Sequence, residues 1–154
     1  MDRTEKEEYI IGCISLLANK FTQFGDNILP DITFKQWFLL MMISKMEIKE
    51  KSINSIAEFV GTSRQNIKKM LISLEEKGYV IISKSTLDAR ALKVELGEKT
   101  YQYFSENADI AAEETNKLFS SFSFEEIENL AYQLDKLLNC LTLYAKRGIN
   151  NEQD

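Results

Sequence analysis

The chain has 154 residues, a length that fits one structural domain with a sizeable hydrophobic core. It contains no histidine, which excludes Ser-His-Asp and Cys-His catalysis and every histidine-containing metal site, so we expect no enzyme, no metal and no cofactor. Its 19 Lys plus Arg against 24 Asp plus Glu give a net charge of −5, which is unusual for a nucleic-acid-binding protein.

The first predicted helix covers residues 5–28. Apolar side chains recur on it at helical spacing: Tyr9, Ile10, Ile14, Leu17, Ala18, Phe21 and Phe24. Pro30 breaks this helix, and Thr33 with Gln36 has the spacing of a capping box that opens a second helix. Ile32 and Trp37 are placed as the hydrophobic staple of that helix.

Two helix patterns joined by a tight turn follow. Ser52 can N-cap a short helix that Gly61 ends, and Ser63 can N-cap a longer one over residues 64–77 that stops at Gly78. At 100° per residue, one face of the longer helix is apolar: Ile67, Met70, Leu71 and Leu74.

The opposite face of helix 64–77 is polar and basic. Packing the apolar face inward points Gln65, Lys68 and Lys69 outward. Amides and cations are the groups that base edges and phosphates require. Ile72 lies on the same outward face, where it contacts either a thymine methyl or a neighbouring element.

After Gly78 the apolar period changes from helical to alternating. Residues 79–83 are apolar and β-branched, and residues 91–96 alternate, with Leu92, Val94 and Leu96 on one side. This pattern predicts a β-hairpin. The connection between its strands, residues 84–90, is too long for a two-residue turn and is expected to protrude.

The protruding loop carries a cation at each end, Lys84 and Arg90. An arginine placed there can enter a minor groove, where the negative potential favours it. The alternative is an ordinary solvated hairpin with surface charge. Charge distribution favours DNA: residues 45–99 hold 11 basic and 8 acidic side chains, while the rest of the chain holds 8 and 16.

A last long helix is predicted after a second capping box, Ser123 with Glu126, and ends near Gly148. One stripe of it is rich in leucine: Leu130, Leu134, Leu137, Leu138, Leu141 and Tyr144. Such a stripe indicates a surface that needs a partner, the alternative being a helix buried within its own monomer. Residues 149–154 have the composition of a disordered polar tail.

Five segments, in the right order and with the right gaps, resemble the MarR family of bacterial winged-helix regulators. They are Ile-Thr-Phe-Lys-Gln-Trp at 32–37, Ile-Ala-Glu at 56–58, Thr-Ser-Arg-Gln-Asn-Ile at 62–67, Leu-Glu-Glu-Lys-Gly-Tyr-Val at 74–80 and Asp-Ala-Arg at 88–90. The resemblance implies a homodimer that reads a near-palindromic DNA site with two recognition helices and two wings. It also implies that Arg90 enters the minor groove, braced by Asp88.

The family resemblance divides the chain into three functional parts. It implies an N-terminal dimerisation helix at 1–30, a winged helix-turn-helix lobe at 31–97 and C-terminal dimerisation helices at 98–148. The chain departs from the family pattern at residues 96–100, Leu-Gly-Glu-Lys-Thr, where Leu-Thr-x-x-Gly is usual. Because Gly97 is a weaker N-cap than threonine, we expect the start of the fifth helix to be frayed.

The predicted fold class is mainly α with a small β-hairpin wing, a winged helix-turn-helix with a helical dimerisation region. The predicted function is a repressor that binds double-stranded DNA and is released by a small ligand or an oxidant. The residues predicted to contact or position DNA are Ser63, Arg64, Gln65, Asn66, Lys68, Lys69, Lys84, Asp88 and Arg90. The alternative is a dimeric winged-helix protein that binds a protein partner or small molecule without specific DNA binding.

Two hypotheses concern the signal. Cys13 and Cys140 could form a thiol switch at the dimer interface; the alternative is that both are small buried hydrophobic side chains, and neither has an adjacent basic residue to favour a thiolate. Phe21, Phe24, Trp37 and Phe38 could line a pocket for a small aromatic or amphipathic effector, the alternative being ordinary core.

The sequence also indicates a location. No apolar run reaches the ~18 residues of a membrane span, and the N-terminal residues lack a signal-peptide core. The two cysteines lack Cys-x-x-Cys spacing, which fits a reducing compartment and no structural zinc. We therefore expect a cytoplasmic protein without a membrane partner.

Overall fold

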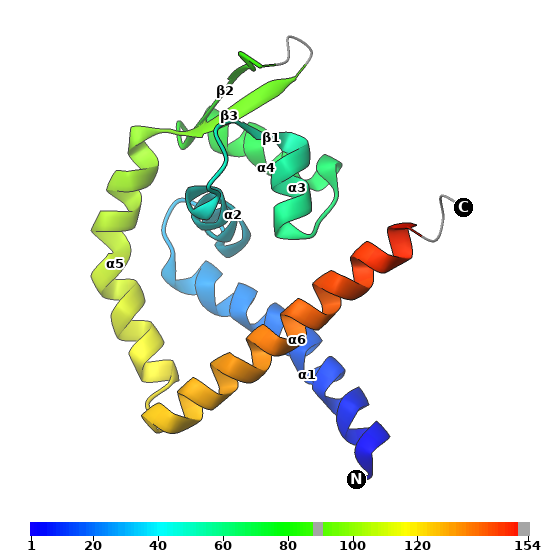
Figure 1. Cartoon of the computed structure of the whole chain (residues 1–154). Helices are drawn as coiled ribbons and strands as arrows, with labels where there is room; N and C mark the ends of the chain where they lie inside the picture. The colour runs from blue at the N-terminus through cyan, green and yellow to red at the C-terminus, as the bar shows by residue number, and fades with distance from the viewer. Residues whose placement is uncertain (88–90, 151–154) are drawn as a thin grey trace. The chain divides into compact units, whose positions relative to one another are not determined.

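The computed structural model describes residues 1–87 and 91–150, with side chains through residue 145 (Figure 1). Within these residues the elements, in chain order, are α1 (Arg3–Ile28), α2 (Phe34–Lys45), β1 (Lys51–Ser52), α3 (Ile53–Val60), α4 (Arg64–Glu76), β2 (Val80–Lys84), β3 (Leu92–Leu96), α5 (Glu98–Leu118) and α6 (Phe124–Asn150). The chain divides into two compact units, Met1–Ala111 and Ala112–Asp154. The predicted fold class, mainly α with a small β wing, is confirmed.

The first unit contains a winged helix-turn-helix lobe. In Figure 1, α2, α3 and α4 gather next to a three-stranded antiparallel sheet of order β1-β3-β2. The predicted hairpin is present, with Val80 paired to Leu96 and Lys84 to Leu92. Beyond the ladder, the Ser85 N–H donates to the Ala91 carbonyl at 2.9 Å. The prediction missed β1, because a strand of two residues has no alternation to detect.

The hydrophobic core of this lobe lies between its three helices and the sheet. Fully buried residues come from each of these elements: Leu39, Leu40, Ile43, Ile56, Ile67, Leu71, Leu74 and Val94. The predicted inward face of α4 is confirmed, with Ile67, Leu71 and Leu74 at 0% exposure. On β3, the alternation holds at buried Val94 and half-buried Leu96, whereas Leu92 is exposed where the hairpin extends past the core.

The predicted ends of α3 and α4 are confirmed, whereas α6 continues to Asn150, two residues into the predicted disordered tail. The hydroxyls of Ser52 and Ser63 each accept a backbone N–H in the first turn of α3 and α4. Gly61 and Gly78, which follow these helices, have positive φ values of 76° and 81° that glycine adopts without strain. Both capping boxes are also formed. Two more were missed: Asp2 with Glu5, which starts α1 at Arg3, and Ser52 with Ser55 at the start of α3.

The start of α5 is held tightly, so the expected fraying is wrong. The Gly97 N–H donates to the Tyr79 carbonyl at 2.8 Å, and the Thr100 hydroxyl donates to the same oxygen at 2.5 Å. A Cβ on Gly97 would lie 2.8 Å from the Gly78 carbonyl oxygen. The glycine that makes a weak cap is therefore the residue that permits this close backbone approach.

We expect Gly97→Ala to lower the free energy of unfolding by about 1–3 kcal/mol, because the new methyl group collides with a backbone carbonyl that cannot rotate away. Urea denaturation followed by circular dichroism measures the change. The matched control is Gly12→Ala on α1, where nothing lies within 4 Å of the added carbon. That substitution should leave stability unchanged or raise it by up to about 1 kcal/mol. Equal stability of Gly97→Ala and the parent protein would contradict this account of the turn.

Long apolar stretches remain exposed on two helices, each in its own unit. On α1 these are Tyr9, Ile10, Ile14 and Leu17, and on α6 they are Leu130, Leu134, Leu138, Leu141 and Tyr144. The α6 leucines in this set are each at least 42% exposed in a single copy of the chain. The predicted leucine stripe of the last helix therefore forms an apolar surface. Among the residues that the structure describes, no helix is both long enough and apolar enough to span a membrane.

Candidate nucleic-acid interface

The outward face of α4 is the first part of the candidate interface. Gln65, Lys68 and Lys69 are exposed on it, as the periodicity predicted, and Arg64 is exposed in the first turn of the helix. Ile72 is 44% exposed on the same helix. The buried face of α4 fixes the direction of this polar face, because Ile67, Leu71 and Leu74 hold the helix against the core. The helix thus offers three cations and one amide to a polyanion.

The first turn of α4 uses two of the predicted DNA-contacting residues to cap itself. The Asn66 N–H donates to the Ser63 hydroxyl at 3.2 Å, and the Asn66 side-chain amide donates to the Thr62 hydroxyl at 3.1 Å. Both residues remain exposed. Their local bonds orient the N-terminal end of the helix, which is the end that enters the groove in helix-turn-helix proteins.

The wing supplies the second part. Lys84 is the last residue of β2 and is exposed. The predicted minor-groove residue Arg90 and its brace Asp88 lie outside the described residues. The start of the wing loop, directly after β2, contacts Glu50. The Glu50 carboxylate accepts from the Ser85 hydroxyl at 2.5 Å, from the Thr86 N–H at 3.1 Å and from the Thr86 hydroxyl. These bonds, with Ser85 as the strongest contributor, lower the pKa of Glu50 to about 2.

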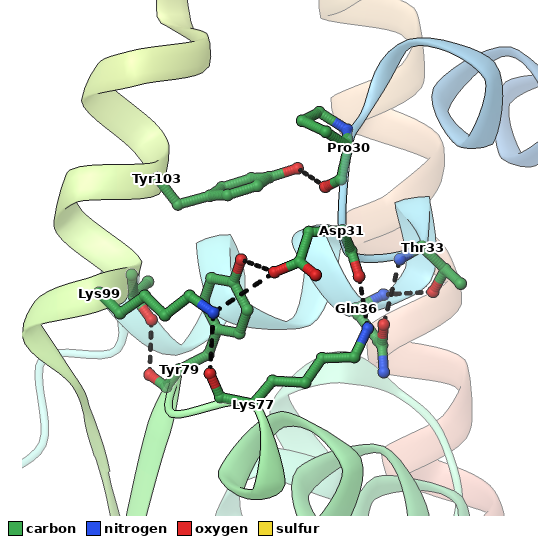
Figure 2. Close-up of polar contacts among 9 residues, drawn as sticks. Pro30, Asp31, Thr33, Gln36, Lys77, Tyr79, Lys99 and Tyr103 are labelled. Carbon is green, nitrogen blue, oxygen red and sulfur yellow. Dashed lines mark hydrogen bonds and ion pairs between the residues drawn. The ribbon is translucent and has the colours of Figure 1, made fainter.

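A polar cluster around Asp31 joins three segments of the first unit (Figure 2): the α1–α2 connection, the residues at the end of α4 and the start of α5. Asp31 lies in the α1–α2 connection with a positive φ of 68°. Its carboxylate accepts from the Tyr79 hydroxyl at 2.6 Å and lies 3.4 Å from the Lys99 ammonium, while its backbone carbonyl accepts from Lys77. The Tyr103 hydroxyl donates to the neighbouring Pro30 carbonyl at 2.8 Å.

This Asp31 cluster fixes the C-terminal end of α4 against the start of α5 and the α1–α2 connection. The Lys99 ammonium also donates to the Lys77 carbonyl at 2.9 Å and lies 4.4 Å from the Tyr79 ring centroid. Tyr79 is almost fully buried, and burial followed by its bond to Asp31 raises the pKa of its phenol. It therefore remains a neutral hydrogen-bond donor at physiological pH.

We expect Asp31→Asn to cost stability at neutral pH and to cost less in acid. The Tyr79 hydrogen bond, followed by the bonds and charge of Lys99 and the charge of Lys77, lowers the pKa of Asp31 below its ordinary value of 3.8. A lowered folded-state pKa means that the carboxylate stabilises the fold above pH 3.8 and that this contribution disappears as pH falls through the lower value. Asparagine tolerates the positive φ, so the substitution tests the charge.

Urea denaturation of both proteins at pH 7 and at pH 3 measures the Asp31 effect. The difference between the two free energies of unfolding should be smaller at pH 3. Asp109→Asn, at an exposed carboxylate on α5, is the control and should show little difference at either pH. A difference for Asp31→Asn that is the same at both pH values would show that the carboxylate charge is not what stabilises the cluster.

A cavity of about 230 Å³ lies beside Trp37 in the first unit. It is lined by Leu29, Trp37, Met41, Ser44, Tyr103, Phe104, Asn107, Ala108 and Ala111. Of the four predicted pocket residues only Trp37 is in this wall. Phe21 and Phe24 are half-buried on α1, and Phe38 is 36% exposed. The wall does contain three aromatic residues, but two of them, Tyr103 and Phe104, come from α5, which the prediction did not consider. The remaining wall is aliphatic apart from polar Ser44 and Asn107.

Cys13 and Cys140 are both free thiols. Cys13 is half-buried on α1 beside Tyr9, and a hydrogen bond with its thiol raises the pKa of that phenol. Cys140 is exposed on α6. The approach of the two thiols at a dimer interface stays a prediction. Nowhere in the described ranges do three or more Cys, Asp or Glu side chains group in a way that could hold a metal ion.

No family model matches the sequence. Three solved structures are similar to the chain over most of both lengths. A MarR/EmrR family transcriptional regulator from Acinetobacter sp. ADP1 has a TM-score of 0.73 and 22% identity, covering 88% of this chain and 96% of that one. The S. aureus MepR–DNA complex has a TM-score of 0.72 and 22% identity, with 83% and 95% covered.

The third is BpsR of Bordetella bronchiseptica, whose DNA binding is regulated by 6-hydroxynicotinic acid. Its TM-score is 0.71 and its identity 15%, with 84% of this chain and 98% of that chain covered. At these identities the likeness establishes the fold. The chain has the winged-helix fold of MarR-family transcriptional regulators, as the sequence resemblance predicted.

Proposed function

We propose that this chain, which has the fold of MarR-family regulators, is a homodimeric transcriptional repressor that binds a near-palindromic site in double-stranded DNA. One observation carries the proposal: α4 presents Arg64, Gln65, Lys68 and Lys69 to solvent beside a β-hairpin wing on the same lobe. In winged helix-turn-helix proteins such a helix lies in the major groove and the wing reaches an adjacent groove. The solved S. aureus MepR–DNA complex, of the same fold, supports this assignment.

Homodimerisation is part of the proposal. Large apolar side chains are exposed along α1 and along α6, as at interaction surfaces, and a second copy of the chain is the partner that the family resemblance implies. A two-fold dimer presents two α4 helices and two wings, so its DNA site should be near-palindromic. Analytical ultracentrifugation should give twice the chain mass at micromolar concentration.

Fluorescence anisotropy tests the proposed function. The purified protein is titrated against DNA from upstream of its own gene and against scrambled DNA, at two salt concentrations. Tight binding that prefers the upstream fragment and weakens with salt supports a sequence-specific regulator. Equally weak binding to both fragments favours the alternative, a dimeric winged-helix protein that binds a protein or small molecule, unless selection from random sequences recovers a tight site.

We expect Arg90→Ala to weaken binding to the specific site by about 1–3 kcal/mol without unfolding the dimer. This expectation rests on the Asp-x-Arg motif at residues 88–90, which lie outside the described residues. Anisotropy gives the affinity, and thermal melting monitors the fold. Unchanged affinity in a folded Arg90→Ala variant would exclude the minor-groove role.

A small aromatic or amphipathic effector is the proposed release signal, and the cavity beside Trp37 is its proposed site. Regulation of BpsR by 6-hydroxynicotinic acid supports ligand control in this fold. An effector releases DNA only if it binds better to a conformation of the dimer that does not bind DNA than to the one that does. A ligand with equal affinity for both conformations would not change their populations. A panel of aromatic acids, starting with 6-hydroxynicotinic acid, should contain a compound that changes both the melting temperature and operator affinity. A panel without one would count against this site.

An oxidant acting on Cys13 or Cys140 is the other proposed signal. Exposed Cys140 is accessible to peroxide in a single copy of the chain, and Cys13 is partly so. Thiol labelling with and without peroxide, in parallel with DNA binding, tests it. Release by peroxide that persists in Cys13→Ser and Cys140→Ser variants would exclude a thiol switch.

A further inference from the structure

The start of the wing loop, the residues that directly follow β2, is bound by one carboxylate from a distant part of the sequence. Glu50 lies in the segment between α2 and β1, 35 residues before Ser85. Its two oxygens accept three hydrogen bonds, from the Ser85 hydroxyl and from the backbone and side chain of Thr86. Ser85 in turn accepts the Leu87 N–H at 3.0 Å. These bonds connect the α2–β1 segment to three successive residues of the wing.

These contacts lie where they can restrict the orientation of the wing loop. The β2–β3 ladder ends at Lys84 with Leu92, followed by the backbone bond from Ser85 to Ala91. The residues immediately beyond are those that Glu50 binds. Hydrogen bonds to a carboxylate are short and directional, so three of them on one group restrict the direction in which the chain leaves the sheet. Lys93, half-buried on β3, adds a nearby positive charge that favours the ionised form of Glu50.

We propose that Glu50 is a positioning residue for DNA recognition, which orients residues 85–87 at the start of the wing loop for contact with DNA. The inference rests on the proposed DNA-binding function. This role can be distinguished from simple charge repulsion, because the two predict opposite effects on DNA binding when the residue is removed. A negative charge near the interface repels phosphate, so its loss alone should strengthen DNA binding. A positioning role predicts that its loss weakens binding to the specific site.

Glu50→Gln tests the proposal, because it keeps the shape of the side chain and replaces one acceptor oxygen by a donor group. The matched control is Glu47→Gln, which removes the same charge from an exposed glutamate in the same α2–β1 segment. In the absence of DNA, amide hydrogen exchange by NMR should be about tenfold faster at Thr86 in Glu50→Gln, which is the loss expected for one charge-assisted bond. It should be unchanged in Glu47→Gln.

The DNA arm uses the specific fragment and scrambled DNA at two salt concentrations. Glu50→Gln should bind the specific site about tenfold more weakly and scrambled DNA no more weakly, whereas Glu47→Gln should lose affinity for neither. Thr86→Val, which removes one of the three donors, should weaken specific binding as well. Its effect should be less than additive with that of Glu50→Gln, because both act on one contact.

Each other outcome overturns the proposal. Unchanged exchange at Thr86 in Glu50→Gln would mean that the contact does not restrain the wing. Faster exchange with unchanged or stronger specific binding would mean that the contact is structural only. If the parent protein binds neither DNA, the proposed function fails and the DNA role of Glu50 with it, while the exchange result still reports on the contact.

Discussion

Leu71→Ala is expected to lower the free energy of unfolding by about 2–5 kcal/mol, whereas Ile72→Ala, its neighbour on the same helix, lowers it by less than about 1 kcal/mol. Leu71 is 0% exposed in the core beneath α4, so truncation removes buried apolar contacts and leaves a cavity. Ile72 is 44% exposed and loses little. Urea denaturation of the two variants measures both changes.

The same pair of variants separates stability from recognition. Folded Leu71→Ala keeps every exposed group of α4, so under conditions where it remains folded its operator affinity should approach that of the parent protein. Ile72→Ala should keep its stability and lose operator affinity if its side chain meets a thymine methyl. Unchanged affinity for Ile72→Ala would leave contact with a neighbouring element as its role. A Leu71→Ala protein as stable as the parent would contradict the position of α4 in the core.

Periodicity was sufficient to predict the faces of α4. The residues at positions 67, 71 and 74 are apolar and recur with the helical repeat, and each is fully buried. The hairpin was predictable because its strands alternate, and the helix ends because capping residues act within three or four positions. In each case the physical cause lies within one short segment of sequence.

The contacts that position the site have no such local signature. Glu50 and Thr86 are 36 residues apart, and Asp31 and Lys99 are 68 apart. Each is an ordinary polar residue in an exposed segment, and its partner is determined by the folded topology. Gly97 was misinterpreted for the same reason: as a cap it is weak, but its role is set by the Gly78 carbonyl, which only the fold brings near. The cavity beside Trp37 likewise combines residues of three separate helices or connections.

Replacing both Lys68 and Lys69 by alanine is expected to reduce operator affinity about a thousandfold at 0.15 M salt. Both side chains are exposed on α4, and a dimer would lose four phosphate contacts. Each contact contributes about 0.9 to the slope of log K against log salt, so the slope should become shallower by about 3.6. The fold should be unaffected, because neither side chain is part of the core. Anisotropy titrations at four salt concentrations give both quantities.

The control for this experiment replaces Lys20 and Lys35, two exposed lysines on α1 and α2, and so changes the net charge equally. Its affinity should fall far less and its salt slope should not change, because long-range attraction is screened within about 8 Å at this ionic strength. Equal losses for the two pairs would mean that only total charge matters. A Lys68→Ala/Lys69→Ala protein with unchanged affinity and slope would show that α4 does not bind DNA, and the Gln65 and Arg64 assignments would fail with it.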